Sequence, residues 1–153
     1  MATVKTAYGT ATAITWTGQG LNSLPSADYT DQSDPIDNTT NLYLDALVEV
    51  EIANIAEAGN YQVVLYVTSS VDGTDFSTHT GSPAEPQNLA YLGTVPITSG
   101  IGTTVRSRAF SVAAAFGGVM PPKWKLVAYN DVGVALASSA NAAQYRGVYA
   151  QSV

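Results

Sequence analysis

Two glutamates, Glu49 and Glu51, lie two residues apart in an alternating apolar segment, and they come closest to a catalytic carboxylate pair. In a strand this spacing puts their backbones about 6.6 to 7 Å apart on one face, a distance similar to that of the pairs that hydrolyse glycosides. Catalytic pairs normally converge across a cleft from different elements. Two neighbours on one strand therefore fit an exposed acidic ladder better, and we expect no enzyme.

Basic residues that could face this ladder occur much later in the chain, since no Lys or Arg lies between Lys5 and Arg106. Arg106 and Arg108 share one face of an expected strand. They could pair with the early acids within one chain or between copies, although exposed pairs contribute only about 0 to 1 kcal/mol each. The candidate interface is therefore Asp45, Glu49, Glu51, Arg106 and Arg108.

Other residue types with catalytic or ligating chemistry form no recognisable set. His79, the only histidine, lies in a loop rich in Ser, Thr and Pro, and no Ser occupies a G-x-S-x-G turn. Four aspartates recur every third residue: Asp28, Asp31, Asp34 and Asp37. Their oxygens could gather calcium, but the spacing is not that of an EF-hand, and aspartates that cap their own turns are favoured. We predict no catalytic residue, cofactor or metal ligand, and the cation question at this loop stays open.

Aromatic residues offer another kind of chemistry, because Trp16, Trp124 and the 9 tyrosines could stack on sugars. In alternating strands, aromatic side chains are more often core or cross-strand packing. The sequon Asn38-Thr39-Thr40 is a short pattern that arises often by chance and means little without secretion.

Composition limits the classes of partner. The chain has 153 residues, enough for one domain with a real core, and its net charge of -6 argues against binding nucleic acid through phosphates. Only 12% of residues are charged, which is common where partners cover much of a surface. The sequence has no cysteine, no secretion signal and no membrane-spanning apolar run. We expect a protein made in the cytoplasm, with no membrane or nucleic-acid partner.

The elements that would position these residues are strands. The longest is Leu42 to Ile52, in which Leu42, Leu44, Ala46, Val48, Val50 and Ile52 alternate with the outward acids. Its expected antiparallel partner is Tyr61 to Ser69. Further strands are expected at Thr10 to Trp16, Leu89 to Ile97, Val105 to Val112, Trp124 to Asn130, Val134 to Ala137 and Gln144 to Gln151.

Strand breaks and loops complete this organisation. Gly93 and Pro96 suit an edge strand or a bulge, and Thr17 to Asp34 has the composition of a loop. Residues 1–9 should form a flexible N-terminal arm, ordered only if something holds it, and residues 10–153 one domain. About eight strands without a useful amphipathic helix predict an all-β fold, a single antiparallel, jelly-roll-like β-sandwich.

Three segments resemble those of small virion proteins of tailed bacteriophages in their sequence, order and spacing. They are I-D-N-T-T-N-L-Y-L-D-A-L-V at Ile36 to Val48, V-D-G-T-D-F at Val71 to Phe76, and F-S-V-A-A-A-F-G-G-V-M-P-P-K-W at Phe110 to Trp124. The first 35 residues match less clearly. None of the three segments indicates a functional site, so they point to a family and not to a mechanism.

The resemblance implies a capsid decoration, or cement, protein located on the capsid surface of the virion. Such proteins bind the major capsid protein from outside, commonly as dimers or trimers. On this expectation, a sheet face or edge makes the oligomer, while the N-terminal arm and the loops Thr17 to Pro35 or Thr78 to Asn88 reach the shell. The alternatives are a tail or baseplate structural protein and a carbohydrate-binding or receptor-binding module.

Overall fold

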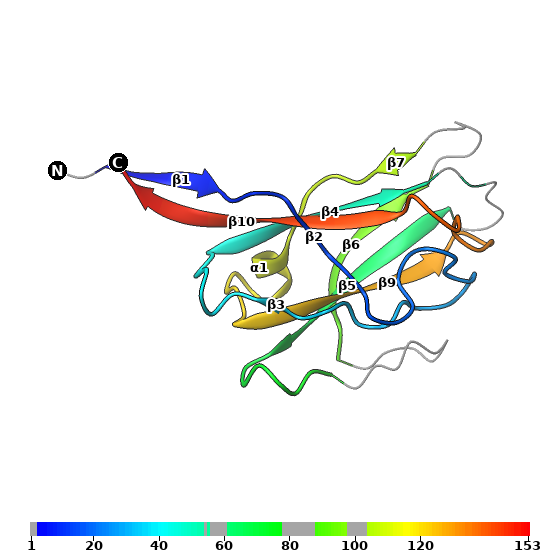
Figure 1. Cartoon of the computed structure of the whole chain (residues 1–153), viewed down its shortest axis with the longest axis horizontal. Coiled ribbons are helices and arrows are strands. Elements are labelled where there is room, and N and C mark those ends of the chain that lie inside the picture. Colours follow the sequence, from blue (N-terminus) through cyan, green and yellow to red (C-terminus); the bar gives the residue numbers. More distant parts are fainter. Residues whose placement is uncertain (1–2, 54, 56–60, 78–87, 98–103) are drawn as a thin grey trace.

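The chain folds into a sandwich of two antiparallel sheets, as the sequence predicts (Figure 1). The computed structural model describes residues 3–53, 55, 61–77, 88–97 and 104–153. One sheet contains β1 (Val4–Tyr8), β2 (Thr12–Ala13), β4 (Asp45–Ile52), β7 (Val105–Arg106), β8 (Phe110–Ser111) and β10 (Ala142–Ser152). The other contains β3 (Ile36–Asp37), β5 (Gln62–Ser70), β6 (Ala90–Pro96) and β9 (Lys123–Asp131). The helix α1 (Val112–Ala115) is a single turn.

The core lies between the sheets and follows from the alternation of each strand. Ala46, Val48, Val50 and Ile52 of β4 are fully buried, and the residues between them are half-exposed. The facing residues of the other sheet are Val63, Leu65 and Val67 of β5 and Trp124, Leu126 and Ala128 of β9, also fully buried. The predicted inward face of the long strand is therefore correct from Ala46 onward.

The start of that strand was predicted wrongly. Leu42 and Leu44 are exposed, and β4 begins only at Asp45. Asn38 explains the difference, because its side-chain oxygen accepts a hydrogen bond from the Tyr43 N–H at 2.7 Å and its amide donates to the Tyr43 carbonyl at 3.0 Å. Leu42 also has a positive φ of 52°. The polar turn therefore continues through Tyr43, and periodicity alone could not show where it ends.

The expected pairing of the long strand with Tyr61 to Ser69 is also wrong. β4 pairs with β10, β7 and β8, whereas β5 lies in the opposite sheet between β9 and β6. Tyr61, expected to face the core, is exposed with a positive φ of 57°. β4 and β5 therefore belong to different sheets, and their apolar faces oppose each other across the core.

Several strand boundaries differ from the predicted ones. Thr10 to Trp16 forms only the two-residue β2, and Val105 to Val112 is divided into β7, β8 and the start of α1. Val134 to Ala137 is no strand. Leu89 to Ile97 is confirmed as an edge strand, β6, and the β5–β6 ladder shifts register between Leu65 and Tyr66.

The segment Thr17 to Asp34 is a loop as predicted, but its second half runs along β9. Thr30 N–H donates to the Ala128 carbonyl at 2.8 Å, and the Thr30 hydroxyl accepts from the Ala128 N–H at 2.9 Å. Ser33 repeats this exchange with Leu126. Because two hydroxyls take the place of backbone carbonyls, this half of the loop covers the edge of β9 between Leu126 and Ala128.

The N-terminal segment is a strand held by the end of the chain. β1 pairs with β10 from Val4 with Ser152 to Tyr8 with Val148, and the two form a ribbon that extends beyond the sandwich (Figure 1). We call residues 3–8 and 148–153 the ribbon. The N-terminal arm was expected to be ordered only if another segment held it, and in the structure β10 pairs with it.

Most of the loop Thr78 to Asn88 and His79 lie outside the described residues. Among the residues that are described, no helix is long and apolar enough to cross a membrane.

Candidate functional site

The predicted acidic ladder and Arg106 meet within one chain. Arg106 lies opposite Glu51 in the β4–β7 ladder, and its guanidinium contacts Glu49 Oε1 at 3.0 Å and Glu51 Oε2 at 2.7 Å. Gln144 Nε2 also donates to Glu49 Oε1 at 3.0 Å. The two carboxylates thus share one guanidinium, and Glu49 is also hydrogen-bonded by a neutral amide.

The other two residues of the candidate interface do not join this cluster. Asp45 Oδ1 accepts the N–H groups of Ala46 and Ala113 at 2.7 and 2.9 Å, so it ties α1 to the start of β4. The Arg108 guanidinium lies 5.1 Å from the centre of the Phe110 ring. Asp45 therefore has a structural role that its strand spacing did not suggest.

The four regularly spaced aspartates accept hydrogen bonds from backbone N–H groups and side-chain hydroxyls of the chain. Asp31 Oδ2 accepts from the Gln19 N–H, and Asp34 accepts from the hydroxyls of Thr15 and Thr17, each at 2.6 Å. These two hydroxyls hold the pKa of Asp34 below its usual value. Within the described residues, no three His, Cys, Asp or Glu side chains are grouped as they would be to hold a metal ion. The expectation that these aspartates cap their own turns holds for Asp37, which accepts from the Thr39 N–H at 2.7 Å, but Asp31 and Asp34 bind residues 12 to 19 positions away.

The ribbon presents an unpaired backbone edge. Thr3 and Val153 exchange both hydrogen bonds, and the Gly9 N–H donates to Gly147. Because hydrogen-bonded pairs alternate along an antiparallel ladder, the N–H and C=O groups of Val4, Thr6 and Tyr8 point away from β10. In the described part of the chain no strand pairs with this edge.

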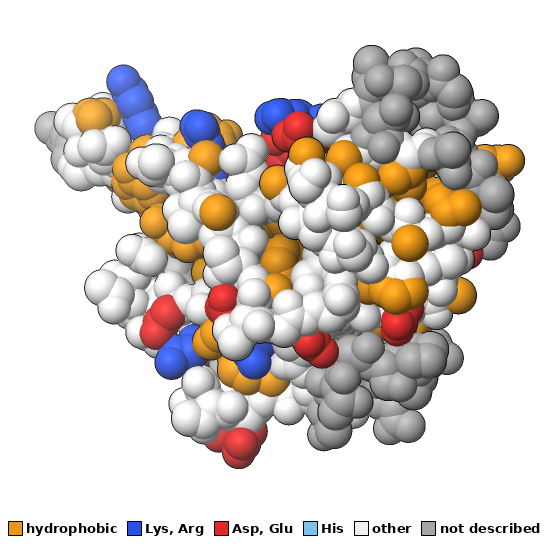
Figure 2. All heavy atoms as spheres, turned by 45° about the vertical axis from the view of Figure 1, so that its right-hand side comes forward, with side chains coloured by type: hydrophobic (Ala, Val, Ile, Leu, Met, Phe, Trp, Pro, Cys, Tyr) orange, Lys and Arg blue, Asp and Glu red, His pale blue; other side chains and the backbone are white. Residues whose placement is uncertain are grey.

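The ribbon surface is mostly apolar or neutral. Val4, Tyr8 and Val153 are 68%, 58% and 62% exposed, and Lys5 is the only charged side chain on the ribbon. In the space-filling view the ribbon projects from the body, and the acidic side chains visible on that face lie elsewhere (Figure 2). An open edge with exposed apolar side chains is a site where another strand can add.

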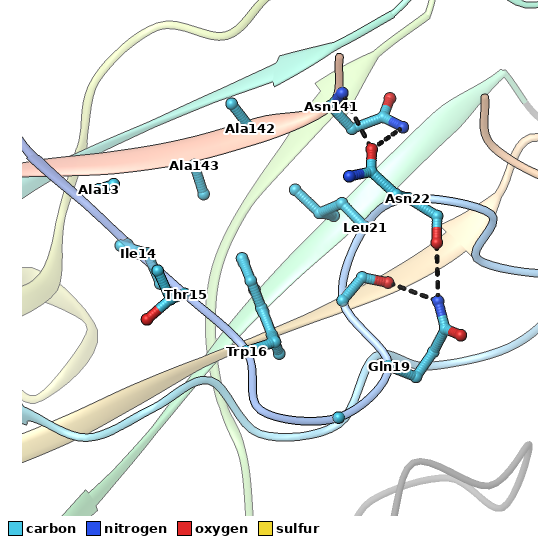
Figure 3. Close-up of a pocket in the computed structure, with 12 residues that line it drawn as sticks. Ala13, Ile14, Thr15, Trp16, Gln19, Leu21, Asn22, Asn141, Ala142 and Ala143 are labelled. Atoms are coloured by element: carbon cyan, nitrogen blue, oxygen red, sulfur yellow. Dashed lines mark hydrogen bonds between the residues drawn. The ribbon is translucent and has the colours of Figure 1, made fainter. Parts of the chain in front are cut away.

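A groove of about 450 Å³ lies between the loop 14–22 and the start of β10 (Figure 3). Trp16 stands between Ile14 and the turn at Gln19, while Asn22, Asn141 and Ala142 line the far side. Asn141 donates from its backbone and its side chain to Asn22 Oδ1, at 3.2 and 3.0 Å. The groove combines one aromatic side chain with carboxamides.

The walls of this groove are tightly braced. The Trp16 indole N–H donates to the Asp31 carbonyl at 3.0 Å, and a Cβ on Gly20 would lie 3.3 Å from the indole. A Cβ on Gly18 would overlap the Asp31 carboxylate. Asp31 therefore supports the groove. Its spacing from the other aspartates suggested a calcium ligand, because the sequence does not show that its carboxylate accepts the Gln19 N–H.

Comparison with known proteins does not identify a family for this chain. No family model matches the chain, and no curated protein sequence matches it. Among solved structures, the "Structure of infectious bursal disease virus Gt strain" aligns at 13% identity with a TM-score of 0.14. The alignment covers 99% of this chain and 42% of that one, so this chain spans less than half of its length. Similarity at this level carries no argument about fold or function.

Proposed function

We propose that this chain is a non-enzymatic virion structural protein of a tailed bacteriophage, which binds the outside of the head and cements major capsid protein subunits. The phage assignment depends on the sequence resemblance of Ile36 to Val48, Val71 to Phe76 and Phe110 to Trp124. The mechanism depends on one structural observation, the unpaired outer edge of β1 in the projecting ribbon.

Strand addition at this edge is the expected mode of attachment. An extended segment of a capsid subunit would hydrogen-bond to Val4, Thr6 and Tyr8, whose backbone groups point outward. An isolated two-stranded ribbon is only marginally stable in water, so a third strand would stabilise it as well as attach it.

Self-association as a dimer or trimer would multiply this contact. Each copy brings one ribbon, and linked ribbons engage the shell with a higher effective concentration than separate ones. The Glu49, Glu51 and Arg106 cluster can contribute to a subunit contact through its exposed surface and its excess negative charge, because one guanidinium serves two carboxylates.

The test mixes purified protein with undecorated expanded heads and with unexpanded precursors, and measures co-sedimentation. We expect binding to expanded heads. Failure to bind either particle would refute attachment to the head, and imaging of labelled virions that places the protein on the tail would support the tail or baseplate alternative instead.

A substitution at Thr6 tests the mechanism separately. Thr6→Pro removes an N–H that points away from β10, so it should preserve the β1–β10 ladder while preventing strand addition at this edge. Thr6→Val is the matched control, since it keeps the N–H and favours a strand. Head binding should be lost in the first variant and retained in the second; equal binding by both would exclude the β1 edge.

A further inference from the structure

The groove between the loop 14–22 and β10 has the size and chemistry of a ligand site that the proposed attachment to a head does not use. Its volume of about 450 Å³ falls within the roughly 300 to 1,000 Å³ typical of small-molecule sites. It lies at the body of the sandwich, and none of the ribbon residues lines it (Figure 3).

The residues that line the groove carry no charge with which to bind an ionic ligand. All 12 residues that line the groove are uncharged, in a chain that carries a net charge of -6. A phosphate or carboxylate ligand would find no cation in the lining, and the nearby Asp31 carboxylate already accepts the Gln19 N–H. The ligand must therefore be recognised through neutral hydrogen bonds and apolar contact.

Trp16 and Asn22 provide these two kinds of contact. The Trp16 side chain is half-buried, and its only polar atom already donates to Asp31, so what it offers a ligand is apolar ring surface. Asn22 uses its side-chain oxygen for Asn141, which leaves the amide N–H groups as donors. In Figure 3 this nitrogen points toward Ala142 and Ala143. An aromatic face beside an amide donor matches the C–H face and the hydroxyls of a sugar ring.

A peptide strand is a poorer occupant of this groove. The backbone of β10 at Ala142 and Ala143 already pairs with β4 on one side, and the Ile14 N–H donates to the Ala143 carbonyl at 2.8 Å on the other. Strand addition is therefore not available here, and recognition falls to side chains.

The groove is also preformed. Asp31 holds both the Gln19 N–H and the Trp16 indole, and the Gln19 side chain donates to the carbonyls of Gly20 and Asn22 at 2.8 and 3.0 Å. Such bracing lowers the cost of ordering the site on binding. We infer that this groove binds a neutral saccharide through Trp16 and Asn22.

The test is an array of neutral, sulfated and sialylated glycans probed with the labelled protein. Fluorescence titration with the best neutral glycan should then report on Trp16, because the only other tryptophan, Trp124, is fully buried. We expect neutral glycans to bind and to change the emission of Trp16. Binding confined to sulfated or sialylated glycans would overturn the inference.

Two variants locate the site without disturbing the core. Ala142→Trp places an indole at the rim of the groove, from an exposed position on β10, and should block binding, whereas Ala114→Trp, exposed on α1 and away from the groove, should leave it unchanged. Asn22→Ala should weaken binding by about 2- to 10-fold, as expected for one hydrogen bond.

The outcomes also separate this inference from the proposed attachment to heads. Ala142→Trp should bind heads as well as the wild type does. If no neutral glycan binds the wild type more strongly than it binds Ala142→Trp, the saccharide site is refuted whatever the heads show. If the same variant also loses head binding, the groove is a contact for protein.

Discussion

The ring of Tyr43 lies directly on Gly147, so that a Cβ at position 147 would overlap the ring carbons. Gly147 lies in β10 where the strand leaves the sandwich and continues as the ribbon, and Tyr43 also packs near Tyr149, with ring centroids 6.2 Å apart. Tyr43 therefore anchors the base of the ribbon, and a side chain at position 147 would displace it.

Gly147→Ala should lower the free energy of unfolding by about 1 to 3 kcal/mol, the usual cost of overpacking, as measured by chemical denaturation. Gly9→Ala is the matched control, because its Cβ would lie at an ordinary 3.4 Å from the Tyr43 hydroxyl. If the two variants are equally stable, Tyr43 moves aside at little cost and does not anchor the ribbon.

A second close approach joins the two sheets. Gly93 of β6 leaves room for the Phe110 ring of β8, which a Cβ at position 93 would overlap. Gly93→Ala should therefore destabilise the protein by about 1 to 3 kcal/mol. In a Phe110→Leu background the same substitution should cost less, and this coupling is measurable in a double-mutant cycle. Strict additivity would show that the ring does not cause the effect.

The sequence was informative where burial follows a period of two. The inward residues of β4 and β5 from Ala46 and Val63 onward, the edge position of β6 and the all-β sandwich could all be predicted, because one face of each strand must be dry. Which strands are neighbours could not be predicted from this pattern. The same alternation in β4 and β5 fits one sheet or two opposed sheets, and only the long-range pairing with β10 and β9 decides.

The candidate site was predictable only in part. Opposite charge on alternating strands suggested that Glu49 and Glu51 could meet Arg106, and the structure places them together in one chain. The groove at Trp16 was missed because its walls depend on Asp31, a residue 15 positions away whose carbonyl accepts the indole N–H. The spacing of neighbouring residues in the sequence does not predict a contact between such distant positions.

The paired charges of Arg106 should contribute little to stability. Its side chain is 58% exposed, so Arg106→Gln should lower the free energy of unfolding by less than about 1 kcal/mol, and added salt should reduce the difference further. Arg106→Glu should cost more, because a third carboxylate would face Glu49 and Glu51. Equal stability of the two variants would mean that the charges do not interact, and a change of oligomeric state in Arg106→Gln would show that the cluster forms a subunit contact.

The turn after β5 should lose stability in acid. The Asp72 carboxylate accepts the N–H groups of Asp75 and Thr74 and the Ser70 hydroxyl, and these bonds hold its pKa well below its usual value. A lowered pKa in the folded state means that the contribution is fully present above the unfolded value of about 3.9 and is lost as the pH falls below it.

Asp72→Asn should therefore be less stable than the wild type at pH 7, and the difference should narrow below about pH 4. Denaturation curves at several pH values measure this difference. Asp75→Asn is the matched control, since it keeps the backbone N–H that Asp72 binds. A difference between the wild type and Asp72→Asn that is constant from pH 7 to pH 3 would contradict this linkage.

Asn130 holds the long loop to the sandwich and should be the most sensitive polar residue of the core. Its buried amide donates to the carbonyls of Leu24, Pro25 and Val134 at 2.8 to 3.0 Å, and its oxygen accepts from the Val132 N–H. Asn130→Ala leaves these groups without that partner, so it should lower the free energy of unfolding by about 2 to 4 kcal/mol.

Asn130→Asp distinguishes lost hydrogen bonds from lost packing, because it keeps the shape and replaces the donor with an acceptor. A carboxylate facing three carbonyls is disfavoured, so the folded state should raise the pKa of this group, and the variant should be less destabilised at pH 4 than at pH 7. Asn41→Ala, which removes one exposed bond of 3.4 Å, should change stability by less than about 0.5 kcal/mol. If Asn130→Ala unfolds at the same denaturant concentration as Asn41→Ala, other contacts hold the loop that forms the groove.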